Sequence, residues 1–376
     1  MMSFARLPRV VFMSGVVALL GSLAARTHAA SPVNYEMVPV GDPGNAVDST
    51  GYGRVDYQYD IGKYHVTIEQ YCDFLNAVAK TDTYGLYDEG VNWPPVSGIS
   101  RGGSVGSYTY TPTDPIGPSI AGITAGNRPI TKLTWFSAAR FTNWMANGQP
   151  TGAQSAGTTE QGAYTLDGKT TGSQVARNTI NPNTGVTPTF ALPTENEWYK
   201  VAYYKGGGTT AGYWNYATQN DTPPGNDLLT SGSNSANYFS TGNPSNLPNT
   251  HDRFTINSGD NDFLLSHLTA VGMFAGTTTA YGVYDMNGNA FSWLETPVNP
   301  FDIEGTYVRG GTWDQREGVT NFSRNSRVYT GNYDSNPNIG IRLVSVTAVP
   351  EPSTCALALA GLAYGGYSLV RRRKRA

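Results

Sequence analysis

The chain has 376 residues, a net charge of −3 and charged side chains at only 14% of positions, against roughly 25% in an average soluble domain. Aromatic residues reach 12%, including 24 tyrosines and 7 tryptophans, and there are 44 glycines and 23 prolines. This composition excludes a coiled coil, which needs charged heptads, and a disordered acidic chain, which lacks aromatics. It also argues against a helical bundle and predicts a loop-rich, weakly charged domain with an aromatic core.

The first 29 residues have the pattern of a secretory signal peptide. Arg6 and Arg9 precede a mostly apolar run over residues 10–25, and small residues follow near position 29. A single membrane anchor is the alternative, but the apolar run is short for one. We therefore expect residues 1–29 to direct export and the mature domain to cover residues 31–349.

The chain ends in a three-part pattern over residues 350–376. Pro350-Glu351-Pro352 precedes an apolar run over residues 353–370, and the basic cluster 371–375 follows at once. The run is near the lower limit for a membrane span, and the basic cluster favours a cytoplasmic end. A plain tail anchor is one interpretation. The ordered set resembles the PEP-CTERM sorting signal, which implies processing by an exosortase, transient membrane anchoring, and delivery to the envelope or extracellular matrix of a bacterium.

Charge and cysteine content narrow the range of partners and redox chemistry. Without both ends, the domain keeps 17 basic and 27 acidic side chains, a net charge of −10. Such a domain repels phosphate backbones, so we expect no nucleic-acid partner. The only cysteines are Cys72 and Cys355, and Cys355 lies in the tail, so no internal disulfide is expected. Cys72 is either an inert, half-buried thiol or a nucleophile that needs an activating base nearby.

Three helices are predicted from start signals followed by helical spacing of apolar residues. Thr67 and Gln70 form a capping box before an apolar face of Tyr71, Phe74, Leu75 and Val78. The second helix follows residues 129–134 and ends at Asn147-Gly148; its shared face is Ala138, Phe141, Trp144 and Met145. In the third, Thr194 is the N-cap, Glu197 is its partner, and Trp198, Val201 and Ala202 face the core.

The remaining segments read as short strands and long loops. Residues 60–66 are predicted as a strand leading into the first helix, and residues 339–346 as a final strand. Residues 281–295 and 307–312 read as short strands and turns. The stretches 81–127, 149–189 and 206–280 lack periodicity and read as loops, the second with room for one hairpin.

Two patterns in the sequence resemble catalytic motifs. Residues 98–102 match the Gly-x-Ser-x-Gly nucleophile elbow, which requires a strand before it and a helix after it. Both flanks read as loop, so we interpret the match as chance. Glu195 and Glu197 could be an acid/base pair, but helix capping explains Glu197 and the helix dipole explains Glu195.

Metal-binding patterns are sparse. His65, His251 and His267 lack zinc spacing, and no cysteine supports them. Residues 334–338 begin like an EF-hand loop, but Ile339 and Ser345 stand where that loop needs Gly and Glu. Asp260-Asn261-Asp262 leaves calcium binding and a polar turn as alternatives. The chain has no phosphate loop and no dinucleotide fingerprint.

Several segments, in order, resemble the formylglycine-generating enzyme (sulfatase-modifying factor) family. The most specific is Leu192-Pro193-Thr194-Glu195-Asn196-Glu197-Trp198. The others are 61–67 with 74–76, 129–131 with 135 and 138–144, 282–293, 308–313, and 340–343. Together they cover about residues 35–346. The resemblance implies an irregular α+β fold related to C-type lectins, with few short helices and strands and many loops.

The resemblance also implies structural Ca²⁺. Of the matching positions, Asn289 would be a calcium ligand, and Asn237 in Ala236-Asn237-Tyr238 matches another calcium position. The family usually has Glu where Ser292 stands, which removes a charged oxygen from the site.

The family's chemistry needs a cysteine pair that holds Cu(I) and activates oxygen. From Gly310-Gly311-Thr312 to Arg342 this chain has no cysteine, so no catalytic residue carries over and we do not expect copper. A related branch with a histidine-bound iron has an added helical domain that is not present here.

We therefore expect a non-catalytic surface or matrix protein whose domain is a binding or scaffold module for envelope glycans or proteins. Tyrosine and tryptophan rings could stack on sugars or fill the core. The alternatives are an oxygen-dependent oxidoreductase with a remodelled site and a plain structural protein of the envelope.

Overall fold

A computed structural model describes residues 32–88, 98–113, 124–226, 233–241, 252–254, 267–297, 305–315 and 322–346. The predicted signal peptide and sorting tail lie outside these residues, as do His251 and residues 260–262. Within the described residues, no helix is both long and apolar enough to cross a membrane.

The three predicted helices are confirmed together with their caps. They are α1 (Ile68–Val78), α2 (Trp135–Ala146) and α3 (Glu195–Tyr203). Thr67 and Gln70 form the predicted capping box of α1, and Thr194 and Glu197 form that of α3. Each reciprocal bond satisfies backbone N–H groups that a helix start leaves without a partner. Short turns of helix also occur at Ala125–Asn127 (η1) and, with π-type bonding, at Ala156–Glu160 (η2).

Two small sheets form the centre of the molecule. The first has the order β1-β2-β11 and is antiparallel, with β1 at Met37–Val40, β2 at Tyr59–Gly62 and β11 at Val344–Ser345. The second has the order β10-β7-β8-β9, from Ile339–Gly340, Phe291–Pro297, Gly305–Arg309 and Val328–Gly331. In this sheet β10 runs parallel to β7 and the other pairs are antiparallel. The fold is therefore α+β, as expected.

Four strand and loop predictions differ from the structure. Residues 339–346 are not one strand, because β10 and β11 belong to different sheets and the buried residues 341–343 lie between them. The predicted strand 60–66 is only β2, which ends at Gly62. The supposed loop 81–127 contains a hairpin of β3 (Ile99–Gly102) and β4 (Thr109–Pro112). The supposed loop 206–280 contains β5 (Phe239–Thr241) paired with β6 (Asp252–Phe254).

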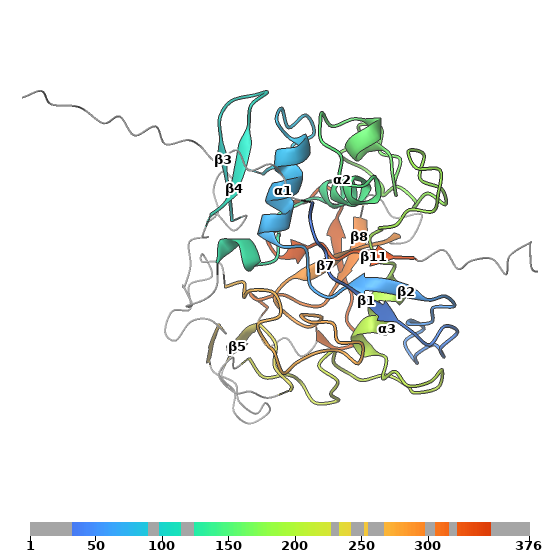
Figure 1. Cartoon of the computed structure of the whole chain (residues 1–376). Helices are drawn as coiled ribbons and strands as arrows, with labels where there is room; N and C mark the ends of the chain where they lie inside the picture. Colours follow the sequence, from blue (N-terminus) through green and yellow to red (C-terminus); the bar gives the residue numbers. More distant parts are fainter. Residues whose placement is uncertain are drawn as a thin grey trace, which may run out of the picture.

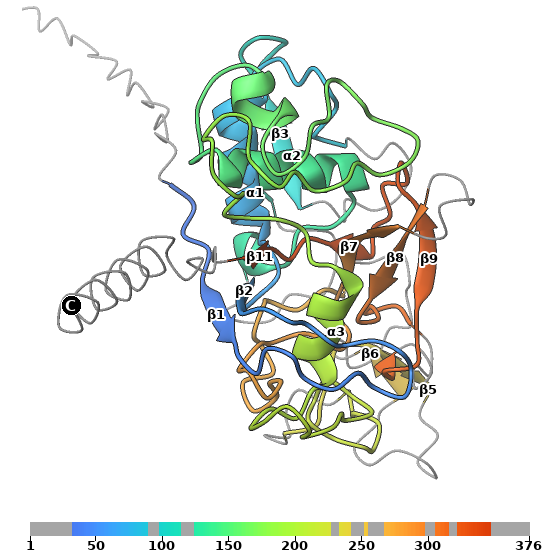
Figure 2. The same cartoon turned by 90° about the vertical axis from the view of Figure 1, so that its right-hand side faces the viewer.

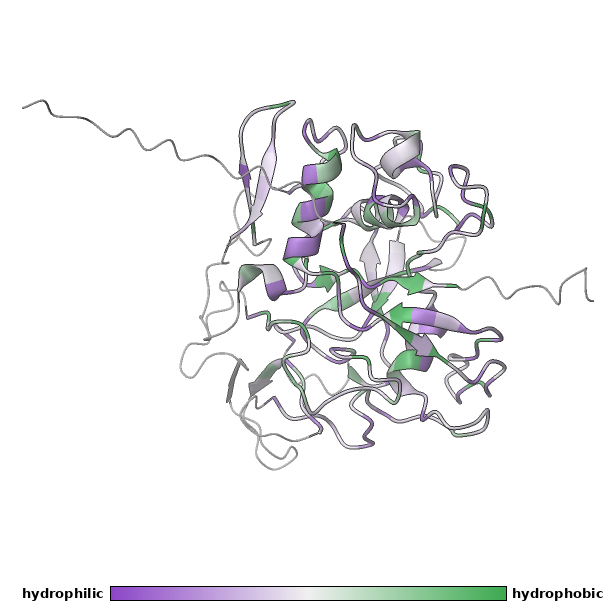
Figure 3. Cartoon of the chain, viewed as in Figure 1, coloured by the Kyte–Doolittle hydropathy of each residue, from purple (hydrophilic) through white to green (hydrophobic). Residues whose placement is uncertain are grey.

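The core lies on both sides of these sheets. Helices α1 and α2 pack above them and α3 below them (Figure 1; Figure 2). The larger apolar cluster joins α1 and α2 to β7 and includes Phe74, Phe141, Trp135 and Trp293. The second cluster surrounds α3 and is rich in tyrosine. Apolar residues concentrate on the central strands and on part of α1, whereas polar residues dominate the outer loops (Figure 3).

Candidate functional site

The two predicted calcium positions lie side by side in the structure. The Asn237 amide Nδ2 donates to Asn289 Oδ1 over 2.9 Å and to the His267 carbonyl over 2.9 Å. The backbone N–H of Asn289 donates to the Asn237 carbonyl at 2.9 Å. Both side chains are buried, and Asn289 has a left-handed φ of 64°. Residues 52 positions apart are thus joined at one polar corner.

The amide oxygens of this pair have different surroundings. Asn289 Oδ1 accepts two N–H groups, from Asn237 and from Thr269. Asn237 Oδ1 and Thr269 Oγ1 are buried without a hydrogen-bond partner. A buried polar atom without a partner is costly unless something else satisfies it. The oxygens at this corner therefore fit a cation. Asn237 is the side chain whose Oδ1 is free to coordinate it.

The charge at this corner does not favour tight binding. Among the described residues, no three His, Cys, Asp or Glu side chains gather closely enough to hold a metal ion. The Ser292 hydroxyl is directed at His65 Nε2, 3.0 Å away. Calcium affinity rises with the number of charged ligands, and this corner offers neutral oxygens.

His65 and Ser292 are not a catalytic dyad. On its other side, the His65 ring receives a hydrogen bond at Nδ1 from Arg342 Nη2, 3.2 Å away. Nucleophile activation needs a histidine nitrogen that can take the serine proton. Here a guanidinium occupies the place where a carboxylate would hold the base, and both side chains are buried. Burial and the charge of Arg342 also lower the pKa of His65 well below its usual value.

In the family, the cysteine pair that binds copper follows the segment that begins at Gly310. In this chain, residues 310–314 make contacts within the domain. Gly310 accepts a backbone bond from Gly288, and a side chain on Gly311 would overlap the Phe322 ring. Asp314 accepts hydrogen bonds from Thr312 and Asn338. Burial raises the pKa of Asp314.

Cys72 lies in α1, within the larger apolar cluster, and is a free, buried thiol. Burial first, and then Asp73 and Glu69, raise its pKa above the usual value. A thiol in such surroundings stays protonated and is a poor nucleophile.

Glu195 and Glu197 belong to two buried ion networks, which is more than capping and the helix dipole require. Glu195 pairs with Arg309 of β8 at 2.7 Å and with Arg327 at 2.6 Å. The Arg327 guanidinium also stacks on the Tyr307 ring, with 3.4 Å to its centroid. Nothing in the local sequence signals these pairs, because the partners lie more than 100 residues away.

The second network joins α3 to β7. Arg177 contacts Glu295 at 2.8 Å and Glu197 at 3.3 Å, and Glu197 also accepts from Tyr57. Burial raises the pKa of Glu295 to about 7, opposed by Arg177. The Glu197 and Glu295 carboxylates thus share the Arg177 guanidinium, and these polar contacts all lie within the domain.

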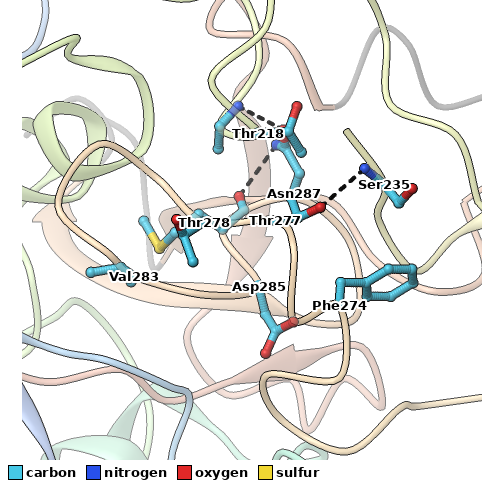
Figure 4. A pocket seen from close by; sticks show the side chains of 10 residues that line it. Thr218, Ser235, Phe274, Thr277, Thr278, Val283, Asp285 and Asn287 are labelled. Carbon is cyan, nitrogen blue, oxygen red and sulfur yellow. Dashed lines mark hydrogen bonds between the residues drawn. The ribbon is translucent and has the colours of Figure 1, made fainter. Parts of the chain in front are cut away.

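A small polar cavity lies between residues 217–218, Ser235 and the 274–287 segment. It is lined by hydroxyl and amide side chains, Phe274 and the Asp285 carboxylate (Figure 4). Its volume of about 10 Å³ is near the size needed for one water molecule. Asp285 accepts from the Gly272 backbone at 2.7 Å, and burial raises its pKa to about 6. The cavity is too small for an organic ligand.

The remaining motif has the wrong context for catalysis. Ser100 of the Gly-x-Ser-x-Gly match lies in β3, which turns back into β4. A nucleophile elbow needs a strand-to-helix turn, so this match is fortuitous.

Comparison with solved structures gives three similar chains, each with a TM-score of 0.40. CarF is 20% identical, and the match covers 84% of this chain and 99% of that one. Treponema denticola variable protein 1 is 16% identical over 84% and 96%, and PvdO from Pseudomonas aeruginosa is 13% identical over 85% and 96%. No curated protein is matched.

The family comparison is more direct. The model of the sulfatase-modifying factor enzyme 1-like domain matches residues 48–347, which is most of the chain. The match includes both asparagines of the polar corner, all three helices and the Gly310-Gly311-Thr312 segment. The chain therefore belongs to the family of sulfatase-modifying factor enzyme 1-like domains.

Proposed function

We propose that this chain is an exported, exosortase-sorted protein of the cell envelope or matrix whose domain is a non-catalytic binding or scaffold module. One observation carries the proposal: the sequence contains no cysteine between Gly310 and Arg342. Copper-dependent oxygen activation in this family needs a thiolate pair in that segment, and Cu(I) selects soft thiolate ligands.

The buried charges support a structural role. Glu195, Glu197 and Glu295 are all held by arginines within the domain. Through these ion pairs, the three carboxylates connect α3, β7 and β8. Groups held in this way stabilise a scaffold and are not available to a substrate.

In this proposal, Ca²⁺ is a structural ion bound weakly at the corner of Asn237 and Asn289. Asn237 would supply an amide oxygen, and Asn289 would fix the orientation of Asn237. The ion would neutralise the unpaired oxygens and hold residues 237 and 267–269 against the 286–289 turn. The partners are envelope glycans or envelope proteins, together with the exosortase that processes the tail.

The sorting part of the proposal is tested by the mass of the intact protein purified from its native envelope. We expect the mass to lack the signal peptide and the basic cluster 371–375. Recovery of the full C-terminus in the envelope would refute exosortase processing. The binding part is tested with the same material on an array of envelope glycans, where retention of none would favour the plain structural protein.

Family membership supports a second candidate, an oxygen-dependent oxidoreductase with a remodelled site. Aldehyde formation on a sulfatase-type cysteine peptide would separate this candidate from the binding module.

A further inference from the structure

His65 lies where three segments meet, namely residues 62–68, β7 and residues 339–343. Its ring contacts Ser292 of β7 on one side and Arg342 on the other. Gly340 of β10 lies so close that a side chain there would reach within 3.4 Å of the His65 ring. The ring is 1% exposed, so it is sealed from solvent.

The partners fix the protonation state of this ring. An arginine can only donate hydrogen bonds, so Nδ1 of His65 must be an acceptor. The neutral ring then carries its proton on Nε2 and donates it to the Ser292 hydroxyl oxygen. The observed geometry is therefore specific to one neutral tautomer.

A second proton would have no acceptor. It would sit on Nδ1, facing the Arg342 guanidinium at 3.2 Å, and would place two positive charges together. Arg342 donates its other hydrogen bonds to the Gly62 and Tyr284 carbonyls, which carry no charge. Buried like charges this close repel strongly.

The other titratable groups around the ring do not compensate for this charge. From the N-terminal segment, the Tyr35 hydroxyl bonds the Tyr64 carbonyl, and burial raises its pKa to about 12, so it stays neutral. From the loop before β7, Asp285 interacts with Arg342 electrostatically and itself takes up a proton near pH 6. Acidification thus removes a negative charge that interacts with Arg342 while adding a positive charge at the ring.

The segments that meet at His65 are also joined by backbone hydrogen bonds, from the Gly62 N–H to the Leu343 carbonyl at 2.8 Å and from the Phe291 N–H to the Asn338 carbonyl at 2.9 Å. Val66 N–H donates to the Ile341 carbonyl at 2.8 Å, and β10 pairs with β7 over only two residues. A change at the ring therefore acts directly on the joint between β7 and β10.

We propose that His65 is a proton-sensitive latch that closes the joint between residues 62–68, β7 and the 339–343 segment, and that opens when its ring is protonated. The latch is distinct from the proposed binding role and does not depend on it.

The test is hydrogen exchange, measured by mass spectrometry on the processed full-length protein at about pH 7.5 and about pH 5 and corrected for intrinsic rates. Opening lets the ring regain an ordinary histidine pKa of about 6.5, so open states should become roughly 30-fold more populated between these conditions. We expect this rise in peptides covering 62–68, 289–295 and 339–345, and a smaller one in α2.

His65→Asn keeps an acceptor for Arg342 but does not titrate, so its peptides should show no such rise. Asp285→Asn should keep the rise, because it leaves the ring intact. An unchanged rise in His65→Asn, or no rise in the wild type, would overturn the proposal. If His65→Asn does not fold, the pKa of His65 is measured instead by an NMR titration of the wild-type histidine rings. Titration of His65 with an ordinary pKa while the joint stays protected also refutes the latch.

Discussion

Glu195 in the first turn of α3 and Arg309 at the end of β8 form a buried, two-bonded ion pair. Arg309 Nη2 and Nε lie 2.7 and 2.8 Å from the same carboxylate oxygen of Glu195. Each side chain is at most 3% exposed. The pair fixes the start of α3 against the central sheet, and Arg327 binds the other oxygen of the carboxylate.

Glu195→Gln should therefore destabilise the domain strongly. It leaves Arg309 buried without its countercharge, and breaking a buried pair from one side costs about 3–5 kcal/mol. The measurement is the free energy of unfolding in urea. Glu69→Gln is the matched control, because Glu69 also lies in the first turn of its helix, α1, but is exposed. Its cost should stay within about 1 kcal/mol. Equal effects of the two substitutions would contradict a structural ion pair at Glu195.

Local sequence patterns predict how α3 begins but do not predict the ion pair between Glu195 and Arg309. The caps at Thr67 and Thr194 were predicted because each depends on residues three positions apart. Glu195 and Arg309 are 114 positions apart, and no local pattern relates them. The sequence therefore showed that Glu195 begins a helix but did not show what its carboxylate binds.

The candidate site divides in the same way. Asn237 and Asn289 were singled out through the family resemblance, and the structure places them in contact. The Asn289 oxygen accepts N–H groups from Thr269 and Asn237, whereas the Asn237 oxygen has no partner. This difference depends on tertiary contacts, so the sequence alone does not reveal it. The error at residues 339–346 has a similar cause, because the strand pattern is continuous while the two sheets are separate.

Asp285 should make the domain less stable as the pH rises from about 4 to 6. Its pKa is raised from 3.8 to about 6, mainly by burial, so the native state holds the proton more tightly than the unfolded state. The stabilising contribution is complete below the unfolded pKa and is lost as the pH rises through the native pKa. Asp285→Asn removes this titration. Its melting temperature relative to wild type should climb between pH 4 and 6 and then level off. A constant difference would refute the assignment.

Calcium should stabilise the domain modestly. Binding to the native state alone raises the free energy of unfolding by RT ln(1 + [L]/Kd). With neutral oxygens at the corner, we expect about 1 kcal/mol in millimolar calcium, or roughly 2–4 °C in melting temperature. Asn237→Ala should abolish the shift between chelator and calcium, and Asn237→Asp should enlarge it by adding a charged ligand.

Asn45→Ala is the control for the calcium experiment. Asn45 is equally buried, but its oxygen accepts from Val55 and its nitrogen donates to Gly53 and Tyr213. It should lower the melting temperature without changing the response to calcium. Identical melting in chelator and calcium for the wild type would show that the corner binds no calcium.

The domain should not convert cysteine to formylglycine. The reaction needs two soft thiolates on Cu(I), and the sequence offers none between Gly310 and Arg342. Cys72 cannot supply them, because it is a single thiol, 2% exposed in α1, with its pKa raised by burial. The measurement is incubation of the processed protein with Cu(I), oxygen and a sulfatase-type cysteine peptide, followed by mass spectrometry for the aldehyde.

We expect no conversion by the wild type and none by Cys72→Ser, with melting temperatures showing that both are folded. Because Cys72 belongs to the larger apolar cluster, Cys72→Ala is a second variant that introduces no hydroxyl group there. Conversion by the wild type that Cys72→Ser and Cys72→Ala both abolish would make Cys72 a copper ligand and overturn the non-catalytic role. Conversion that survives both substitutions would instead require a metal site without thiolates, and it would favour the remodelled oxidoreductase over the binding module.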